Sequence, residues 1–187
     1  GVPFLRLLID GFIAYDISRF VILTGYMSQK IVSYFRDGSS LGCSIAYSNE
    51  DYPLGSGGAL MAAKDLLEDE FIYTNGDDLP TINCRNLVSD FHRESSLGMV
   101  VVCKDSKGNL NVDEQSGRVK EYSAFLPLPY LDCGTKVFRK EILGLMRYED
   151  HFDLEPALWP VLIDKQQLST FLTFSRPRGV ADFLTQK

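Results

Sequence analysis

Residues 44–78 carry the stretch that decides the fold, and they read SIAYSNEDYPLGSGGALMAAKDLLEDEFIYTNGDD. Ser44 to Tyr47 and Glu70 to Thr74 are short runs that contain apolar, aromatic and β-branched residues, which predicts two strands. Between them, Ala59 to Leu67 is rich in alanine, leucine and methionine and holds no helix breaker, which predicts a helix. Strand, helix and strand joined by short connections are typical of parallel strands linked by crossover helices.

The same alternation continues on both sides of this stretch. Upstream, apolar residues recur at a three-and-four spacing over residues 3–14, which predicts a helix with Pro3 at its first helical position. Phe20 to Leu23 predicts a buried strand, and Ser28 offers a side-chain cap for a helix that Gly38 closes. Downstream, we expect a helix capped by Asn83, a strand over 98–103, a hairpin over 109–112 and 118–123, a strand over 131–138, helices over 140–146 and from Asp153, a strand over 168–174 and a terminal helical turn over 180–185.

The rhythm of these elements predicts a single α/β domain over residues 1–187. Its sheet is expected to be Rossmann-like, mixed but mainly parallel, with helices on both faces. No internal repeat, low-complexity stretch or linker interrupts the chain.

Composition and charge exclude several classes of protein. With 45% apolar and 24% charged residues the chain is an ordinary globular sequence, and its net charge of −6 disfavours binding to nucleic acid or to an anionic membrane surface. No apolar run approaches the roughly 20 residues of a membrane span, and no leader pattern opens the chain. We therefore expect a soluble cytoplasmic protein whose four cysteines are reduced.

A glycine-rich loop follows the strand at Ser44 to Tyr47. Ligands of parallel α/β sheets bind beyond the carboxyl ends of the strands, which is where this loop lies. Gly55, Gly57 and Gly58 surround Ser56 and would let an anionic or flat group approach the backbone, while the next helix would offer unpaired N–H groups. The alternative is a glycine-rich turn that merely enters a helix.

A second loop, Asn75-Gly76-Asp77-Asp78, follows the next strand. A carboxylate at Asp77 is suited to Mg²⁺, which usually takes one or two protein carboxylates and completes its shell with phosphate oxygens and water. The alternative is an Asx turn that ends the strand. The two loops together favour a magnesium-dependent nucleotide site.

Taken together, the two loops resemble those of the sugar-1-phosphate nucleotidyltransferases, also called nucleotide-sugar pyrophosphorylases. That family carries E-x-x-P-L-G-T-x-G-A-L and then N-G-D. This chain reads E-D-Y-P-L-G-S-G-G-A-L from Glu50 to Leu60 and N-G-D from Asn75 to Asp77, with Ser56 in place of threonine. The similarity is greatest to the mannose-1-phosphate and heptose-1-phosphate guanylyltransferases.

Further matches follow in order along almost the whole chain. The family pattern I-x-x-Y-F-x-D-G-S-x-x-G matches residues 31–42, F-H-R matches 91–93, and the hairpin pattern G-R-V matches 117–119. Further along, I-N-A-G-x-Y-x-F matches residues 131–138, F-S-L-E matches 152–155, and F-P matches 159–160. The resemblance implies a fold like that of the nucleotide-diphospho-sugar transferases.

The resemblance also implies an enzyme that joins a sugar 1-phosphate to a nucleoside triphosphate and releases pyrophosphate, with Mg²⁺ as cofactor. Such transfer depends on positioning and charge neutralisation. By similarity, Asp77 is the catalytic residue and metal ligand. The implied nucleotide-binding residues are Glu50, Gly55, Ser56, Gly57, Asn75 and Gly76, and the implied sugar-phosphate-binding residues are Asp132, Gly134 and Glu155.

Three departures from the family pattern bear on activity. The nucleotide-binding loop G-x-G-T-R, with its downstream K-P, is not found ahead of the helix at residues 3–14. The lysine of E-K-P falls near Ala124 and Phe125, and the second metal carboxylate of D-x-G-T falls around Arg176 to Gly179, with Asp182 out of register. Since the family's first strand is central to the sheet, we expect about 25 further residues ahead of Gly1, or another strand in that place.

Two alternative functions stay open beside the enzyme. A degenerate homologue could bind a nucleotide sugar or a catalytic subunit and regulate it, which the three departures favour. A glycosyltransferase of a related fold also uses an acidic motif at a strand end, but the segment from Leu54 to Leu60 argues against it. The partners expected of the enzyme are the two substrates and a second copy of the chain in a homo-oligomer. The base and the sugar are not specified.

Overall fold

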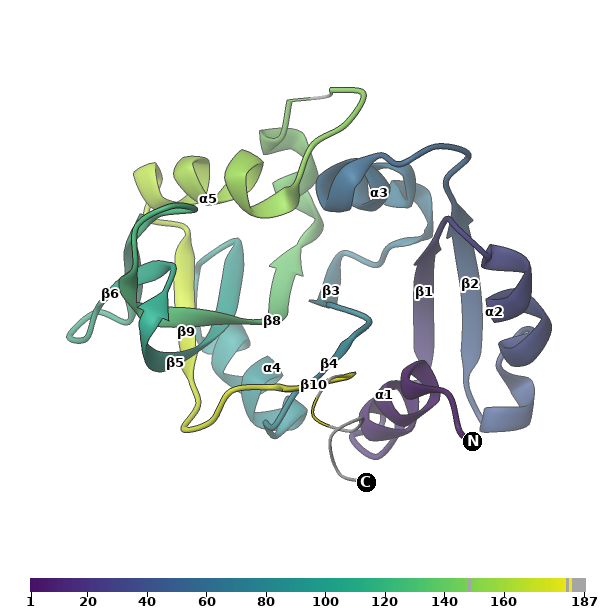
Figure 1. Cartoon of the computed structure of the whole chain (residues 1–187). Helices are drawn as coiled ribbons and strands as arrows, with labels where there is room; N and C mark the ends of the chain where they lie inside the picture. Colours follow the sequence, from purple (N-terminus) through teal and green to yellow (C-terminus); the bar gives the residue numbers. More distant parts are fainter. Residues whose placement is uncertain (148, 181, 183–187) are drawn as a thin grey trace.

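The chain alternates helices and strands in its first half and becomes rich in strands in its second half (Figure 1). The computed structural model describes residues 1–147, 149–180 and 182. The α-helices are α1 (Phe4–Ile13), α2 (Ser28–Phe35), α3 (Gly55–Ala62), α4 (Cys84–Arg93) and α5 (Leu154–Asp164), and the 3-10 helices are η1 (Ser39–Leu41), η2 (Lys64–Leu66) and η3 (Lys140–Leu145). The strands are β1 (Arg19–Thr24), β2 (Ser44–Asn49), β3 (Glu70–Thr74), β4 (Asp78–Leu79), β5 (Gly98–Gly108), β6 (Leu110–Asp113), β7 (Arg118–Tyr122), β8 (Leu128–Arg139), β9 (Leu168–Leu172) and β10 (Arg178–Gly179).

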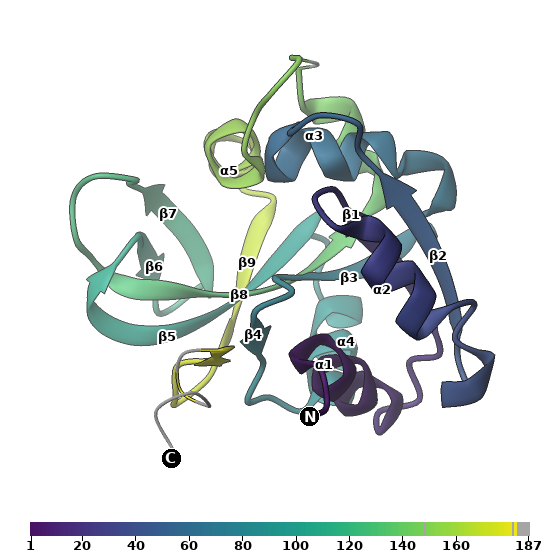
Figure 2. The same cartoon turned by 45° about the vertical axis from the view of Figure 1, so that its right-hand side comes forward.

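The strands of the described residues form three hydrogen-bonded groups. β1 pairs with β2 in parallel, β4 pairs with β10, and six strands pair in the order β3-β8-β5-β9-β7-β6. β6 also pairs with β8, so the far end of the large sheet curls back on itself, as Figure 2 shows. The mixed α/β class is confirmed.

The expected predominance of parallel pairing is wrong in detail. Among the described residues of the six-stranded sheet, β5 and β9 form the only parallel pair. The reason is β8, which lies between β3 and β5 and runs antiparallel to both. A hairpin of β6 and β7 adds further antiparallel pairs, as the turn at 113–117 predicted.

Helices cover both faces of the large sheet, as predicted. On one face, α4 packs its Leu87 and Phe91 against Met99, Val101 and Val137 of β5 and β8. On the opposite face, α3, α5 and η3 bury the other side of these strands in a larger cluster around Phe138 and Trp159. Alternate residues of each strand thus serve separate cores, because successive side chains point to opposite faces.

Several helix starts differ from the prediction by a few residues. α3 begins at Gly55, not Ala59, and ends at Ala62, so the glycine-rich segment is itself the first turn of the helix. Pro3 precedes α1 as its N-cap, and the N-cap of α2 is Met27 in a left-handed conformation, so Ser28 is helical and does not cap.

Other local predictions are confirmed. Asn83 caps α4 by accepting hydrogen bonds from the N–H groups of Arg85 and Asn86 at 3.0 and 3.3 Å. The cysteines are free thiols, three of them buried and Cys43 half-buried. Among the described residues no helix has the length and apolarity to cross a bilayer. The helical turn expected over 180–185 falls largely on residues outside the described ones.

Candidate active site

A long groove separates β1 from β3, and it leads to the two loops that the sequence singled out. Its volume is about 940 Å³, and β1 and β3 line it along their length, with α1 and α3 contributing to its walls. An ion pair between Arg19 and Glu68 joins the starts of the two strands, so both strands run in the same direction along the groove. In the structure each of these strands has a hydrogen-bonded neighbour on one edge and the groove on the other.

At the carboxyl ends of β1 and β3, the groove brings together loops that are distant in sequence. Gly55 and Ser56 at the start of α3 line it, and so do Asn75, Gly76 and Asp77 after β3. Asp77 is exposed, and its main-chain carbonyl oxygen accepts a hydrogen bond from the N–H of Val180 at 3.1 Å. The glycine-rich segment and the aspartate at the strand end therefore face the same space.

The start of α3 is occupied by the segment that leads into α5. The N–H groups of Gly57 and Gly58 donate to the carbonyl oxygen of Phe152 at 3.0 and 3.3 Å, and the N–H of Ser56 donates to Asp153 Oδ1 at 3.3 Å. The prediction that unpaired N–H groups here await a nucleotide is therefore wrong, because residues 152 and 153 already accept their hydrogen bonds.

Two glycines are needed for this close packing. Gly55 has a φ of +74°, and a Cβ there would stand 2.4 Å from the carbonyl oxygen of Phe152. A Cβ at Gly57 would stand 2.3 Å from the Phe152 ring. Gly57 is buried under that ring and does not line the groove, so the structure shows a packing role for it, and its predicted contact with a nucleotide remains a prediction.

Glu50 belongs to the wall of the groove. Its carboxylate accepts a hydrogen bond from the N–H of Leu54 at 3.1 Å and lies against Gly25, where a Cβ would meet Glu50 Oε1 at 2.7 Å. The side chain thus fixes the loop between β2 and α3 against the end of β1. Its predicted contact with a nucleotide remains a prediction.

Gly134 connects the Asn75 loop to β8. The N–H of Asn75 donates to the carbonyl oxygen of Gly134 at 3.1 Å. Gly134 has a φ of +77°, and a Cβ there would lie 2.8 Å from Asn75 Nδ2 and 2.9 Å from Asp78 Oδ2. Only glycine fits this contact without strain. The loop that carries Asp77 is therefore seated directly on the residues predicted to bind sugar phosphate.

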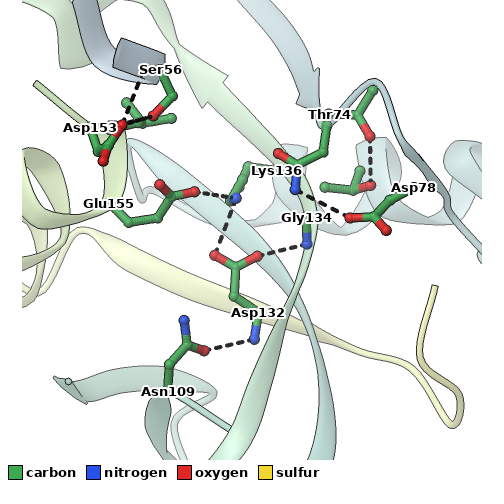
Figure 3. A network of polar contacts seen from close by, with 12 residues as sticks. Ser56, Thr74, Asp78, Asn109, Asp132, Gly134, Lys136, Asp153 and Glu155 are labelled. Atoms are coloured by element: carbon green, nitrogen blue, oxygen red, sulfur yellow. Dashed lines mark hydrogen bonds and ion pairs between the residues drawn. The ribbon is translucent and has the colours of Figure 1, made fainter. Parts of the chain in front are cut away.

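Those residues form a network of charges, drawn in Figure 3. Lys136 Nζ lies 2.6 Å from Glu155 Oε1 and 3.2 Å from Asp132 Oδ2. Asp132 Oδ1 accepts a hydrogen bond from the N–H of Gly134 at 2.8 Å. The Asp132 side chain is only 5% exposed and that of Glu155 is 24% exposed. Neither side chain lines the groove, and Glu155 is the more exposed of the two, so their predicted contacts with a sugar remain predictions.

The sequence reasoning missed Lys136, Phe152 and Asp153. Lys136 had a readable signal, since it stands where the family pattern I-N-A-G-x-Y-x-F places tyrosine, and a strand puts residues 132, 134 and 136 on one face. Phe152 and Asp153 stood in the match to F-S-L-E, but their contact with α3 had no signal, because it joins segments almost 100 positions apart.

The residues at the groove fit Mg²⁺ in part. Asp77 offers an exposed carboxylate, a hard oxygen ligand, beside the phosphate-sized space of the groove. Across residues 1–147, 149–180 and 182, no three His, Cys, Asp or Glu side chains gather closely enough to hold a metal ion. A magnesium ion here would therefore depend on oxygens of its ligand, as this cation commonly does.

Known structures share this fold. The crystal structure of HddC from Yersinia pseudotuberculosis matches with a TM-score of 0.81 over 98% of this chain and 84% of that one, at 19% identity. A putative glucose-1-phosphate thymidylyltransferase from Bacillus anthracis matches with a TM-score of 0.78 at 16% identity. At these identities the likeness shows the fold, which confirms a nucleotide-diphospho-sugar transferase-like architecture.

Sequence comparison identifies the family. The chain is 29% identical over 171 residues to the mannose-1-phosphate guanylyltransferase of Mycobacterium tuberculosis, covering 87% of this chain and 47% of that protein. It is 28% identical over 160 residues to the D-glycero-alpha-D-manno-heptose 1-phosphate guanylyltransferase of Campylobacter jejuni, covering 83% and 71%. It thus spans about half the length of the first relative. The family model described as nucleotidyl transferase matches residues 3–111, more than half of the chain, so the chain belongs to the nucleotidyl transferase family.

Proposed function

We propose that this chain provides the greater part of a site that transfers a nucleotidyl group to a sugar 1-phosphate. The observation that carries the proposal is the meeting of two loops at one groove, with Ser56 on one side and Asp77 on the other. The contact between Asn75 and Gly134 places the charged network of Glu155 next to them. A nucleotide and a sugar phosphate would thereby occupy neighbouring positions.

In the proposed reaction, a phosphate oxygen of the sugar 1-phosphate attacks the α-phosphorus of a nucleoside triphosphate. A new P–O bond forms, the bond to the β-phosphate oxygen breaks, and pyrophosphate leaves. The protein contributes positioning and charge, not a covalent nucleophile. Gly55, Ser56, Asn75 and Gly76 would contact the nucleotide. Glu155 would accept hydrogen bonds from sugar hydroxyls and so hold the acceptor in line.

Asp77 would hold the metal ion of this reaction. Bound Mg²⁺ neutralises phosphate charge and aligns phosphate oxygens. The chain's own contribution is the exposed carboxylate at the end of β3, kept in place by the hydrogen bond from Val180 to its main chain.

The names of the relatives support the reaction class. Two of them are guanylyltransferases of sugar 1-phosphates, and a UTP--glucose-1-phosphate uridylyltransferase of Synechocystis matches at 25% identity. A second HddC structure is a complex with GMP-PN. These names differ in base and sugar. We therefore propose the general reaction, with guanosine triphosphate and mannose 1-phosphate as the first pair to test.

The direct test is pyrophosphate release from GTP, UTP, dTTP or CTP with a panel of sugar 1-phosphates and Mg²⁺. We expect release with at least one pair, and a fall of about 100-fold or more in Asp77→Asn, since a carboxylate that stabilises transition-state charge is lost. Asp65→Asn, which removes an exposed carboxylate on η2, is the matched control and should keep the parent rate.

A regulatory role is the second candidate, and one observation favours it. Ala124 and Phe125 stand where the family has the E-K-P lysine. Neither residue carries a positive charge that could neutralise the sugar phosphate, and Phe125 is 96% exposed. If calorimetry shows that the protein binds a nucleotide sugar, and no pyrophosphate is released in the enzyme assay, the regulatory function replaces the enzymatic one as the proposal.

We further propose that an additional extended segment fills the space between β1 and β3. Within the described part of the chain, both strands face the groove with edges whose N–H and C=O groups have no strand partner there, an arrangement that a parallel strand would satisfy. Helices cover the groove from both sides, so the added strand would be apolar on both faces. The cytoplasmic location and the homo-oligomer remain predictions.

A further inference from the structure

The charged network under α5 contains a fully buried lysine that the proposed reaction does not use. Lys136 is 1% exposed, and its Nζ lies between the carboxylates of Asp132 and Glu155 (Figure 3). Below and beside it, the rings of Tyr73 and Trp159 have their centroids 5.6 and 5.9 Å from Nζ. Such packing holds the ammonium group in one place, because ring faces attract a cation.

Asp132 and Glu155 favour the charged form of Lys136. Burial lowers the pKa of Lys136, but Asp132 and Glu155 raise it more, so the pKa lies above the ordinary 10.5. Burial in turn raises the pKa of Asp132. Two carboxyl groups thus flank a single ammonium group, so a ligand that donates hydrogen bonds suits the network better than a ligand that offers only acceptors.

Glu155 is the more exposed of the two carboxyl groups of the network. Both Asp132 oxygens lie against groups of the protein, namely the N–H of Gly134 and Nζ of Lys136. Glu155 is 24% exposed, and Lys136 contacts its Oε1. Within the described residues Oε2 has no hydrogen-bonding partner, so it is the atom that can accept from a ligand hydroxyl.

Two departures from the family pattern meet in this network. The pattern I-N-A-G-x-Y-x-F places asparagine at Asp132 and tyrosine at Lys136, both neutral. Here they are replaced by opposite charges that lie 3.2 Å apart. The Asp132 replacement alone would leave a buried carboxylate without a cationic partner, which is strongly unfavourable, so it belongs together with Lys136.

We propose that Lys136, paired with Asp132, is a specificity-determining positioning residue that aims Glu155 Oε2 at a ring hydroxyl of the sugar 1-phosphate. This inference rests on the proposed function and refines it. The substrate class it selects is a sugar with a hydroxyl donor at that ring position. A deoxy analogue lacking this hydroxyl leaves Glu155 Oε2 without a hydrogen-bond donor and is rejected.

The test compares the parent with the double variant Asp132→Asn/Lys136→Tyr, which restores the neutral pair of the family pattern. Calorimetry measures the Kd of mannose 1-phosphate, its 2-, 3-, 4- and 6-deoxy analogues and GTP. We expect the parent to reject one deoxy analogue at least tenfold. We expect the double variant to lose that discrimination, while its Kd for GTP stays within twofold of the parent.

Two further variants keep the result interpretable. Glu155→Gln retains the shape of the side chain and should lose the same discrimination without the Lys136 change. Lys120→Met removes an exposed lysine that pairs with Asp113 outside the network, and it should behave as the parent. Circular dichroism confirms that each protein is folded before binding is measured.

Unchanged discrimination in a folded double variant or in Glu155→Gln overturns the proposal. So does a parent that treats all deoxy analogues alike, and so does an equal loss of GTP and sugar phosphate binding in the double variant. A parent that binds and discriminates the sugar phosphates but releases no pyrophosphate upholds this inference and rejects the enzyme.

Discussion

Replacing Gly57 with alanine tests the contact between α3 and the segment that leads into α5. The new Cβ would stand 2.3 and 2.5 Å from two ring carbons of Phe152 and 3.2 Å from the main-chain nitrogen of Leu154. Ordinary van der Waals contact begins near 3.4 Å, so the ring must retreat by about 1 Å. Phe152 is 8% exposed and packed among buried residues of the larger core, which leaves it little room.

The expected magnitude follows from two opposing effects. Forcing an extra methyl group into a packed core costs about 1 to 3 kcal/mol. Alanine is a better helix former than glycine by up to about 1 kcal/mol. Because the new Cβ would stand only 2.3 Å from the ring, the upper part of the first range, about 2 to 3 kcal/mol, applies, and we expect a net loss of about 1 to 2 kcal/mol in the free energy of unfolding. At this chain length that loss lowers Tm by about 2 to 8 °C.

Urea unfolding followed by circular dichroism measures the free energy, and a thermal scan gives Tm. A second variant, Gly57→Ala with Phe152→Leu, removes ring atoms near the new methyl group. If the clash is real, the cost of Gly57→Ala is smaller in that background than in the parent, a coupling between contacting residues. A Gly57→Ala protein as stable as the parent, or costs that simply add, would refute the packing account.

The remaining predictions concern other parts of the molecule. Gly11→Ala on the exposed face of α1, where an added Cβ meets nothing within 4 Å, should raise the free energy of unfolding by about 0.5 to 1 kcal/mol in urea titrations. Lys136→Met should lower it by about 3 to 5 kcal/mol, since two carboxylates lose their buried partner, and a drop below 1 kcal/mol would contradict that reading. The pKa of Lys136 is raised in the folded protein, so the stability that its charge contributes is fully present below pH 10.5 and is lost as the pH rises through the folded-state pKa. The free energies of unfolding of the parent and of Lys136→Met should therefore converge at strongly alkaline pH. Burial raises the pKa of the Cys84 thiol to about 11, so iodoacetamide at pH 8 should label half-buried Cys43 well before Cys84, as peptide mass spectrometry would show. An apolar extended hexapeptide such as VIVLVA should pair with the edges of β1 and β3 at the groove and so slow amide hydrogen exchange in both strands. Unchanged exchange rates at a saturating peptide concentration would count against the proposal that an additional strand fills the groove.

Local sequence patterns were sufficient for most of the secondary structure. The strand at Glu70 to Thr74 has the predicted bounds, and Asn83 caps α4 with its own side chain. These features depend on neighbours in sequence, so propensity and capping rules apply to them directly. The start of α3 did not follow from such rules. Its glycines disfavour a helix locally, and the helix forms there because Phe152 and Asp153 accept its first N–H groups.

Strand pairing was harder to predict than the strands themselves. The sequence order of strands and helices suggested parallel crossovers around one hairpin, but β8 inserts between β3 and β5 with the opposite direction. Pairing partners are chosen by which apolar faces can be buried together, and that choice involves residues far apart in the chain.

For the candidate site, the sequence by itself determined the chemical groups, because a glycine-rich loop and an aspartate each follow a strand and so lie at one edge of a parallel arrangement. Tertiary structure decided which of those groups are accessible. It buried Gly57 beneath Phe152 and Asp132 beneath Lys136, and it left Asp77 and Glu155 accessible. Exposure of a side chain depends on what packs over it, and here the covering residues come from distant segments that only the folded chain brings together.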